Sequence, residues 1–306
     1  MVIGFHNTEA VDRNWSASIE NIYHSKYMKT QRKKYITHVF IVFVFVFLTT
    51  ACKSISTTTY RIETPLIPET NSIKILLISD LHNTIYKKDQ TVLINEIRDI
   101  QPDLIIMSGD IFHSTGPKTG AILLLSGISR IAPIYYVTGN HEYRSQDIQS
   151  IRDILFSFGV IILSDNYIII EINNNEIILA GIEDPDRKFF EESEFEHIDI
   201  IENAFRELDD LTSYKILIAH RPENIKIYKK YSFDLVLSGH AHGGQIRIRA
   251  NKNGLYSPNQ GLFPKYSGGI YTHENLAHIV SRGLSLNYPK FPRINNPPEL
   301  VIIILE

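Results

Sequence analysis

Five short polar clusters of this 306-residue chain carry the residue types that bind metals and phosphate groups. They are Asp80-Leu81-His82, Gly109-Asp110, Gly139-Asn140-His141-Glu142, His220 and Gly239-His240-Ala241-His242. Aspartate and asparagine oxygens combined with imidazole nitrogens suit Mn, Fe(II) or Zn better than Ca or Mg, whose ligands are almost all oxygens. Together, the five clusters contain more possible ligands than one ion needs. Two ions roughly 3.5–4 Å apart and bridged by a carboxylate would use them all, a geometry that recurs in phosphoester hydrolysis.

Each cluster directly follows an apolar run that predicts a buried β-strand. The runs are Ile73–Ser79, Asp103–Ser108, Ile134–Thr138, Lys215–Ala219 and Asp234–Ser238. In open α/β sheets, ligands bind in the crevice at the carboxyl ends of the strands, so the clusters should meet at one edge of a sheet. Within Asp80-Leu81-His82 and His240-Ala241-His242, the outer residues point to the same side if the extended conformation continues past the strand.

The order Asp-x-His, Gly-Asp, Gly-Asn-His-Glu, an isolated His and Gly-His-x-His resembles that of the calcineurin-like metallophosphoesterases, from about Ile73 to the C-terminus. Further motifs resemble the YkuE- and YaeI-like, membrane-associated bacterial branch of that superfamily. They are His240-Ala241-His242-Gly243-Gly244-Gln245, Ser281-Arg282-Gly283-Leu284, Pro292-Arg293 and Asn296-Pro297-Pro298-Glu299. This branch usually has Thr where the chain has Ala241, a position that carries no ligand.

The resemblance implies a role for each motif residue. One divalent ion would be held by Asp80, His82, Asp110 and His242, and the other by Asp110, Asn140, His220 and His240, which makes Asp110 the bridge. A metal-bridging hydroxide would attack phosphorus while both ions neutralise charge on the phosphoryl oxygens. His141 would face the substrate phosphate as general acid or electrostatic stabiliser. Glu142 would orient a ligand imidazole or form a surface salt bridge.

The intervening segments predict helices and further strands. Apolar residues at three- and four-residue spacing predict helices at Asp89–Ile100, Thr119–Ile131, Asp147–Phe158, Ile198–Leu208 and Pro222–Lys230. Paired strands are expected at Val160–Ser164, Tyr167–Ile172 and Glu176–Gly181, and more strands at Gln245–Arg249, Ala277–Ser281 and Leu300–Leu305. These elements fit the fold that the resemblance implies: an α/β protein with two mixed β-sheets packed face to face and flanked by helices. One catalytic domain is expected over residues 73–306.

Residues 1–52 have the pattern of a leader. Five basic residues between Lys26 and Lys34 precede the apolar run Val39–Leu48, which is short for a transmembrane helix and of the right length for a signal-peptide core. Met28 is a candidate for the true start. Cys52, the only cysteine, resembles the lipidated cysteine of bacterial lipoproteins, although Thr49 stands where Leu is usual. An uncleaved signal anchor and a plain buried cysteine are the alternatives.

The charges around the apolar run predict its orientation. Because basic residues cluster before it, the N-terminus should stay cytoplasmic, with a membrane-associated catalytic domain outside the cytoplasm, in the bacterial envelope. Residues 53–72 contain Ser, Thr and Pro and are expected to form a tether.

Charge and missing motifs narrow the function classes. With 31 basic and 34 acidic residues, bulk charge gives no support for nucleic-acid binding. The chain has neither a Gly-x-x-x-x-Gly-Lys-Ser/Thr loop nor a Gly-x-Ser-x-Gly elbow. We expect a monomeric, dinuclear-metal phosphodiesterase or phosphatase acting on a lipid- or sugar-linked phosphoester. The alternatives are a UDP-2,3-diacylglucosamine pyrophosphatase of the lipid A type and a non-catalytic envelope lipoprotein with a phosphoesterase fold.

Two groups of residues outside the motif order have open roles. Aromatic residues after His242 would line a lipid or sugar pocket or simply pack: Tyr256, Phe263, Tyr266, Tyr271 and Tyr288. The remaining histidines in the domain are expected to be ordinary core or surface residues: His113, His197, His273 and His278.

Overall fold

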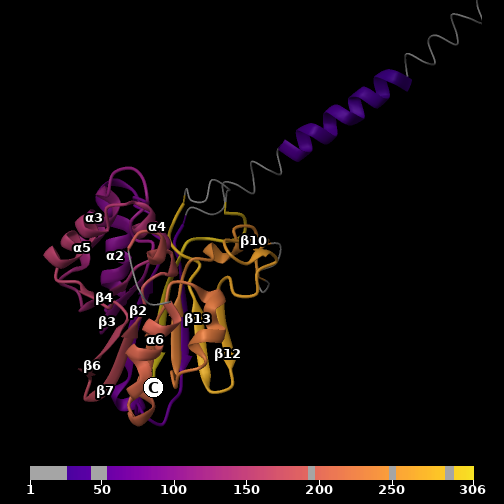
Figure 1. The fold of residues 1–306 in the computed structure, drawn as a ribbon. Helices are drawn as coiled ribbons and strands as arrows, with labels where there is room; N and C mark the ends of the chain where they lie inside the picture. Colours follow the sequence, from indigo (N-terminus) through magenta and orange to yellow (C-terminus); the bar gives the residue numbers. More distant parts are fainter. Residues whose placement is uncertain (1–25, 43–53, 192–196, 248–252, 287–292) are drawn as a thin grey trace, which may run out of the picture. The chain divides into compact units, whose positions relative to one another are not determined.

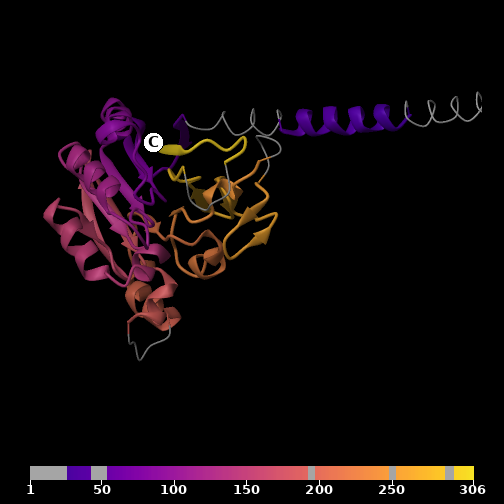
Figure 2. The same cartoon turned by 90° about the horizontal axis from the view of Figure 1, so that it is seen from above.

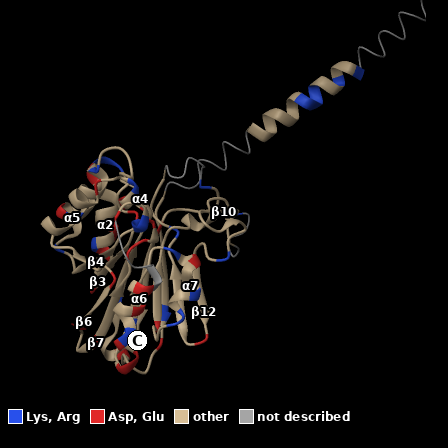
Figure 3. Cartoon of the chain, in the orientation of Figure 1, with Lys and Arg blue, Asp and Glu red and all other residues tan. Residues whose placement is uncertain are grey.

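The computed structural model describes residues 26–42, 54–191, 197–247, 253–286 and 293–306, which belong to two compact units, Met1–Thr50 and Ala51–Glu306. In the first unit, residues 26–42 form a helix with basic and no acidic residues (Figure 3). No helix in the described part of the chain has the length and apolar character needed to cross a membrane. Cys52 and the second half of the apolar run Val39–Leu48 lie outside the described residues.

The second unit contains two six-stranded mixed sheets. The first sheet has the order β1 (Ser56–Ile62), β14 (Glu299–Leu305), β2 (Ile73–Ile78), β3 (Leu104–Ser108), β4 (Ile134–Val137) and β5 (Ile161–Ile162). The second sheet has the order β12 (Gly269–His273), β13 (Leu276–Val280), β9 (Leu235–Ser238), β8 (Tyr214–Ile218), β7 (Asn175–Gly181) and β6 (Asn166–Ile172). A separate hairpin pairs β10 (Tyr256–Ser257) with β11 (Gly261–Leu262).

Helices cover the outer faces of both sheets (Figures 1 and 2). The α-helices are α2 (Thr91–Ile100), α3 (Thr119–Ile128), α4 (Asn140–Arg144), α5 (Ile148–Ser157), α6 (His197–Phe205) and α7 (Ile225–Tyr228). The 3₁₀ turns are η1 (Glu69–Asn71), η2 (Lys88–Gln90), η3 (Pro185–Phe189), η4 (Arg206–Asp210), η5 (Pro222–Asn224) and η6 (His242–Gly244). The helices confirm the five helical segments predicted from the sequence, with ends shifted by a few residues.

Three apolar clusters hold these layers together. The first packs α2, α3 and α5 on the outer face of the first sheet, the second fills the space between the sheets, and the third packs α6 and α7 on the outer face of the second sheet. The central strands β2, β3, β4, β8 and β9 are almost wholly buried, as parallel strands covered on both faces must be. The predicted four-layer α/β sandwich is confirmed.

Two strand predictions near residue 170 had different outcomes. β6 and β7 form the expected antiparallel hairpin, whose turn residues Asn173 and Asn174 both have positive φ, as a two-residue hairpin loop requires. Val160–Ser164 was expected to pair with this hairpin, but its core, β5, instead continues the first sheet in parallel with β4. Leu300–Leu305 lies in the interior strand β14, as predicted.

Two other predictions were wrong. Ser56–Ile62, expected within the tether 53–72, is strand β1 and pairs in parallel with β14 along its whole length. Its side chains alternate between partly buried and exposed, the pattern of an edge strand with one face on the core. Gln245–Arg249, expected to be a strand, contributes in its described part only an isolated bridge between Ile246 and Ile294.

Candidate metal centre

The ligand candidates lie in loops at the carboxyl ends of five strands. Asp80 follows β2, Asp110 follows β3, Asn140 follows β4, His220 follows β8 and His240 follows β9. The first three of these strands belong to the first sheet and the last two to the second sheet. The site is therefore assembled at one end of the sandwich from both sheets, rather than at the edge of a single sheet.

The backbone at the ligand candidates is not extended, contrary to the expectation for the two His-containing pairs. Asp80, His82, Asp110, His240 and His242 all have φ between 48° and 65°. Such a left-handed conformation costs about 1–3 kcal/mol in a residue other than glycine and concentrates at functional sites. Sharp turns, not strand alternation, therefore aim these side chains at one another.

Three of the predicted ligands form the first cluster, from both sheets. His242 Nε2 lies 3.4 Å from Asp80 Oδ1 and 3.4 Å from His82 Nε2, while His82 Nε2 lies 3.9 Å from Asp80 Oδ1. All three side chains are buried, and one ligand atom from each lies within 4.8 Å of the others. A single cation fits such a group.

Asp110, His220 and His240 form the second cluster by the same criterion. His220 Nδ1 donates to the Ser108 carbonyl over 2.7 Å, which directs its Nε2 to Asp110 Oδ2 at 3.3 Å. His240 Nε2 is 2.8 Å from Asn259 Oδ1, so its Nδ1 is the nitrogen left for an ion. Such orienting bonds fix the tautomer of metal-binding histidines.

Asp110 and Asn140 complete the arrangement. Asp110 Oδ2 lies 3.6 Å from His82 Nε2 in the first cluster and 3.3 Å from His220 Nε2 in the second. The buried Oδ1 of Asn140 has no hydrogen-bond partner among the described residues. A buried amide oxygen normally accepts a hydrogen bond, so an oxygen without one is suited to bind a cation. The structure thus brings together the seven residues that the family resemblance implies as ligands, and their binding of metal stays a prediction.

Two motif glycines are required by close approach of the ligand loops. A Cβ on Gly239 would lie 1.8 Å from Ser79 Oγ, and a Cβ on Gly139 would lie 2.3 Å from Asp110 Oδ1. Any side chain at either position would displace a carboxylate or its support. Gly239 and Gly139 thus allow the ligand loops to pack closely against one another.

Glu142 has a role that neither sequence interpretation anticipated. It is fully buried, so it forms no surface salt bridge, and its carboxylate accepts backbone N–H bonds from Asp110, Phe112 and Gly139 at 2.9–3.0 Å. Burial, and then the charge of Asp110, raise the pKa of Glu142 to about 8. The side chain ties the loop after β3 to the loop after β4 and so sets the position of Asp110.

His141 and His113 form one wall of the site. Their rings stack with centroids 4.6 Å apart, and His113 Nδ1 lies 3.1 Å from His82 Nδ1. His113, His141 and His82 make a third group of possible ligands. From the sequence, His113 was expected to be an ordinary core or surface residue. Its position three residues after Asp110, in the same loop, was the available signal.

Burial sets the protonation of most of the histidines. It lowers the pKa of His82, His240 and His242 well below the usual value, so these rings are neutral and offer a lone pair. Burial also lowers the pKa of His220, but the Asp110 carboxylate outweighs it and raises the value to about 10. A cation bound here would displace that proton, because metal ligation requires the neutral imidazole.

The geometry agrees with the comparisons to known proteins. A family model for calcineurin-like phosphoesterases matches residues 73–244, more than half of the chain. The chain belongs to the calcineurin-like phosphoesterase family. It is therefore a metal-dependent phosphoester hydrolase, and the matched range spans all five clusters.

Relatives of this phosphoesterase include uncharacterized bacterial proteins. YpbG of Bacillus subtilis is 30% identical over 240 residues, covering 76% of this chain and 81% of that protein. YkuE of the same organism, named as a metallophosphoesterase, is 26% identical over 267 residues, covering 82% and 86%. The resemblance to YkuE-like proteins is thus confirmed. A dimetal phosphatase structure from Danio rerio aligns with a TM-score of 0.44 at 12% identity, covering 69% of this chain and 87% of that one.

The aromatic residues after His242 lie in different surroundings. Tyr256 and Phe263 are exposed on the β10–β11 hairpin, whereas Tyr266 is buried against Tyr271. Tyr271 lines a cavity whose lining includes none of the proposed metal ligands; Tyr288 lies outside the described residues. His278 is a buried core residue whose Nε2 contacts Ser238 Oγ at 3.1 Å, as expected.

Proposed function

We propose that this phosphoesterase hydrolyses its substrate with two divalent transition-metal ions, held by the seven side chains Asp80, His82, Asp110, Asn140, His220, His240 and His242. The observation that carries the proposal is the pair of buried donor clusters that meet at Asp110. Its mixed oxygen and nitrogen donors favour Mn, Fe or Zn. When bound, such ions lower the pKa of a water molecule and offset the charge that develops on the phosphoryl oxygens.

His141 is proposed to serve the leaving group. Its backbone N–H donates to Asp110 Oδ1 over 2.8 Å, which fixes the residue beside the proposed bridge. Its Nδ1 accepts from the Ser114 N–H at 3.4 Å, and Ser114 Oγ lies 3.1 Å away. With Nδ1 accepting, the ring proton sits on Nε2. In the imidazolium form Nδ1 donates to Ser114 Oγ instead, and the ring can then give its Nε2 proton to a departing alkoxide and become a neutral imidazole.

Removal of metal tests the proposal directly. The full chain, purified in detergent and treated with a chelator, should lose hydrolysis of bis(p-nitrophenyl) phosphate. Added Mn²⁺, Fe²⁺ or Zn²⁺ should restore it, because imidazole-rich sites bind these ions in preference to Mg²⁺. Activity that survives chelation, or that only Mg²⁺ or Ca²⁺ restores, would refute the proposed ligand set.

We further propose a substrate with an apolar portion. The tip of the β10–β11 hairpin places Asn259 against His240, and the same hairpin exposes Leu262 (67%) and Phe263 (73%). Exposed apolar side chains next to a polar site suit a ligand with a lipid part.

Changing both side chains, Leu262→Ser with Phe263→Asn, should raise KM for a long-chain phosphodiester at least about tenfold, since burial of even one such side chain gives roughly 1.5–3 kcal/mol. Asn tolerates the positive φ of residue 263. The nitrophenyl ester should be unaffected. Phe156→Ser on α5, which removes an 82% exposed side chain, is the matched control. If the double variant and the wild-type protein have equal KM values for the long-chain ester, the hairpin has no role in binding the apolar portion of the substrate.

We also propose an envelope location, with the domain outside the cytoplasm and Cys52 acylated. Basic residues before the apolar run Val39–Leu48 support this orientation. A Bos taurus relative named as a transmembrane protein with a metallophosphoesterase domain is 30% identical over 193 residues, covering 59% of this chain and 43% of that protein. Both observations are compatible with attachment through the N-terminal segment.

Cys52→Ser should abolish incorporation of labelled palmitate and either release the protein from membranes or leave an uncleaved precursor. Both outcomes follow because Cys52 is the only thiol of the chain. Fractionation and radiolabelling of cells measure them. A wild-type protein that is membrane-bound yet never labelled would instead favour the signal anchor.

A further inference from the structure

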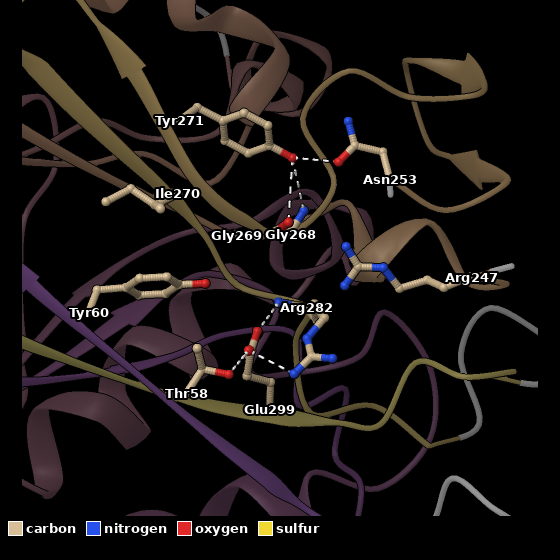
Figure 4. A pocket seen from close by; sticks show the side chains of 10 residues that line it. All are labelled: Thr58, Tyr60, Arg247, Asn253, Gly268, Gly269, Ile270, Tyr271, Arg282 and Glu299. Atoms are coloured by element: carbon tan, nitrogen blue, oxygen red, sulfur yellow. Dashed lines mark hydrogen bonds and ion pairs between the residues drawn. The ribbon is translucent and has the colours of Figure 1, made fainter. Parts of the chain in front are cut away.

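A cavity lies between the edge strands of the two sheets, β1 and β12. Its volume is about 390 Å³, within the roughly 300–1,000 Å³ of small-molecule sites. Tyr60 of β1 and Tyr271 of β12 line it from opposite sheets, and Arg247, Asn253, Arg282 and Glu299 supply its polar groups (Figure 4). None of its lining residues belongs to the metal clusters found in the described part of the chain.

The charges of this cavity favour an anion. Its lining contains two guanidinium groups and one carboxylate. Glu299 is already engaged: it accepts from Arg282 Nη2 at 2.8 Å, from the Arg282 backbone N–H at 3.1 Å and from the Thr58 hydroxyl. Arg247 is only 7% exposed, so its charge is held largely out of water beside that of Arg282. Two guanidinium groups that line one cavity can bind the oxygens of an anionic ligand.

One neutral group of the cavity, the Tyr60 hydroxyl, favours a hydroxyl group on that ligand. The Tyr271 hydroxyl is already bonded, since it donates to Asn253 Oδ1 at 2.9 Å (Figure 4) and accepts the Ser267 backbone N–H at 3.1 Å, and the Asn253 Nδ2 group donates to the Lys265 carbonyl. Burial and the charge of Glu299 raise the pKa of Tyr60 to about 12, so its hydroxyl keeps its proton and can donate. Ile270, 43% exposed, gives an apolar wall for a carbon skeleton. The volume exceeds that of a bare inorganic anion, whose size would leave most of the cavity to water.

We propose that this cavity binds a phosphorylated polyol, with the phosphate at Arg247 and Arg282 and a hydroxyl group at Tyr60. Planar guanidinium forks match the oxygens of a phosphate group. The site is separate from the metal centre and does not depend on the proposed hydrolysis there.

Calorimetric titration of the metal-loaded full chain in detergent tests this site. The probe is 3,4-dihydroxybutylphosphonate, an isostere of glycerol phosphate whose C–P bond resists hydrolysis. We expect a binding event that survives His220→Ala at the metal centre and is weakened at least about tenfold by Arg247→Met, as for loss of a charged hydrogen bond. Arg61→Met is the matched control, since Arg61 lies exposed on β1 and pairs with Glu306.

Additional titrations make the test decisive. Tyr60→Phe removes one hydroxyl and should weaken binding several-fold even if Arg247→Met does not fold. Inorganic phosphate should bind more weakly than the phosphonate, and glycerol should not bind. If micelles containing phosphatidylglycerol displace the phosphonate, the polyol phosphate is a lipid headgroup. If they do not displace it, the ligand is a soluble polyol phosphate. Binding unchanged in both Arg247→Met and Tyr60→Phe, or equally reduced in Arg61→Met, would overturn the proposal.

Discussion

Asp110→Asn should abolish phosphoester hydrolysis and lower the metal content of the protein. Asp110 Oδ2 lies within 3.6 Å of an imidazole nitrogen in each cluster, so the substitution removes negative charge from both proposed sites at once. Bound ions contribute several kcal/mol to transition-state stabilisation, and a loss of about 4 kcal/mol corresponds to roughly a 10³-fold lower rate. Steady-state rates and elemental analysis of the purified variant measure the two effects.

The matched control is Asp103→Asn, one residue before β3. The Asp103 carboxylate accepts the Lys74 backbone N–H at 2.7 Å, and an asparagine oxygen can still accept this bond. The control should therefore keep both metal and activity. Full activity in the Asp110 variant would instead remove the dinuclear mechanism.

His141→Ala should keep the metals but lower the rate by about 10²–10⁴, the usual contribution of general acid catalysis. Alanine still supplies the backbone N–H that binds Asp110 Oδ1, so the proposed bridge should stay in place. The loss should be largest for esters whose leaving alcohol is a weak acid, because nitrophenolate departs without a proton. The measurement is a plot of log kcat/KM against leaving-group pKa for a series of esters, expected to be steeper in the variant.

Two other outcomes would change the role of His141. Equal losses for good and poor leaving groups would assign the ring to stabilising charge on the phosphoryl oxygens. A loss of metal together with activity would make His141 a ligand. A role for His141 as a ligand has a structural basis, because His141, His82 and His113 form one of the groups that could hold a metal ion.

The strands and the motif positions could be predicted because both depend on local sequence. Buried parallel strands such as β3 are continuous apolar runs, and the polar residue that ends each run marks the ligand loop. Strand β1 was missed because its segment Ser-Thr-Thr-Thr-Tyr-Arg-Ile has few apolar residues, and only its pairing with β14 reveals it as an edge strand. That pairing joins residues more than 240 positions apart, which no local pattern records.

Details of the site required the tertiary structure. The positive φ values at Asp80 and His240 oppose the local preference of those residues and are imposed by neighbouring loops. Glu142 could not be assigned from sequence, since its three backbone partners depend on the packing of the loop after β3 against the loop after β4. His113 joins the site for the same reason, through its contact with His82.

Metal analysis of the wild-type full chain tests the central claim most directly. The account predicts about two equivalents of Mn, Fe or Zn per chain, because each of the two donor clusters, which meet at Asp110, can hold one ion. Reloading the chelated protein should restore hydrolysis in parallel with the second equivalent. Full activity with a single equivalent, or with none, would contradict a dinuclear centre built from these seven residues.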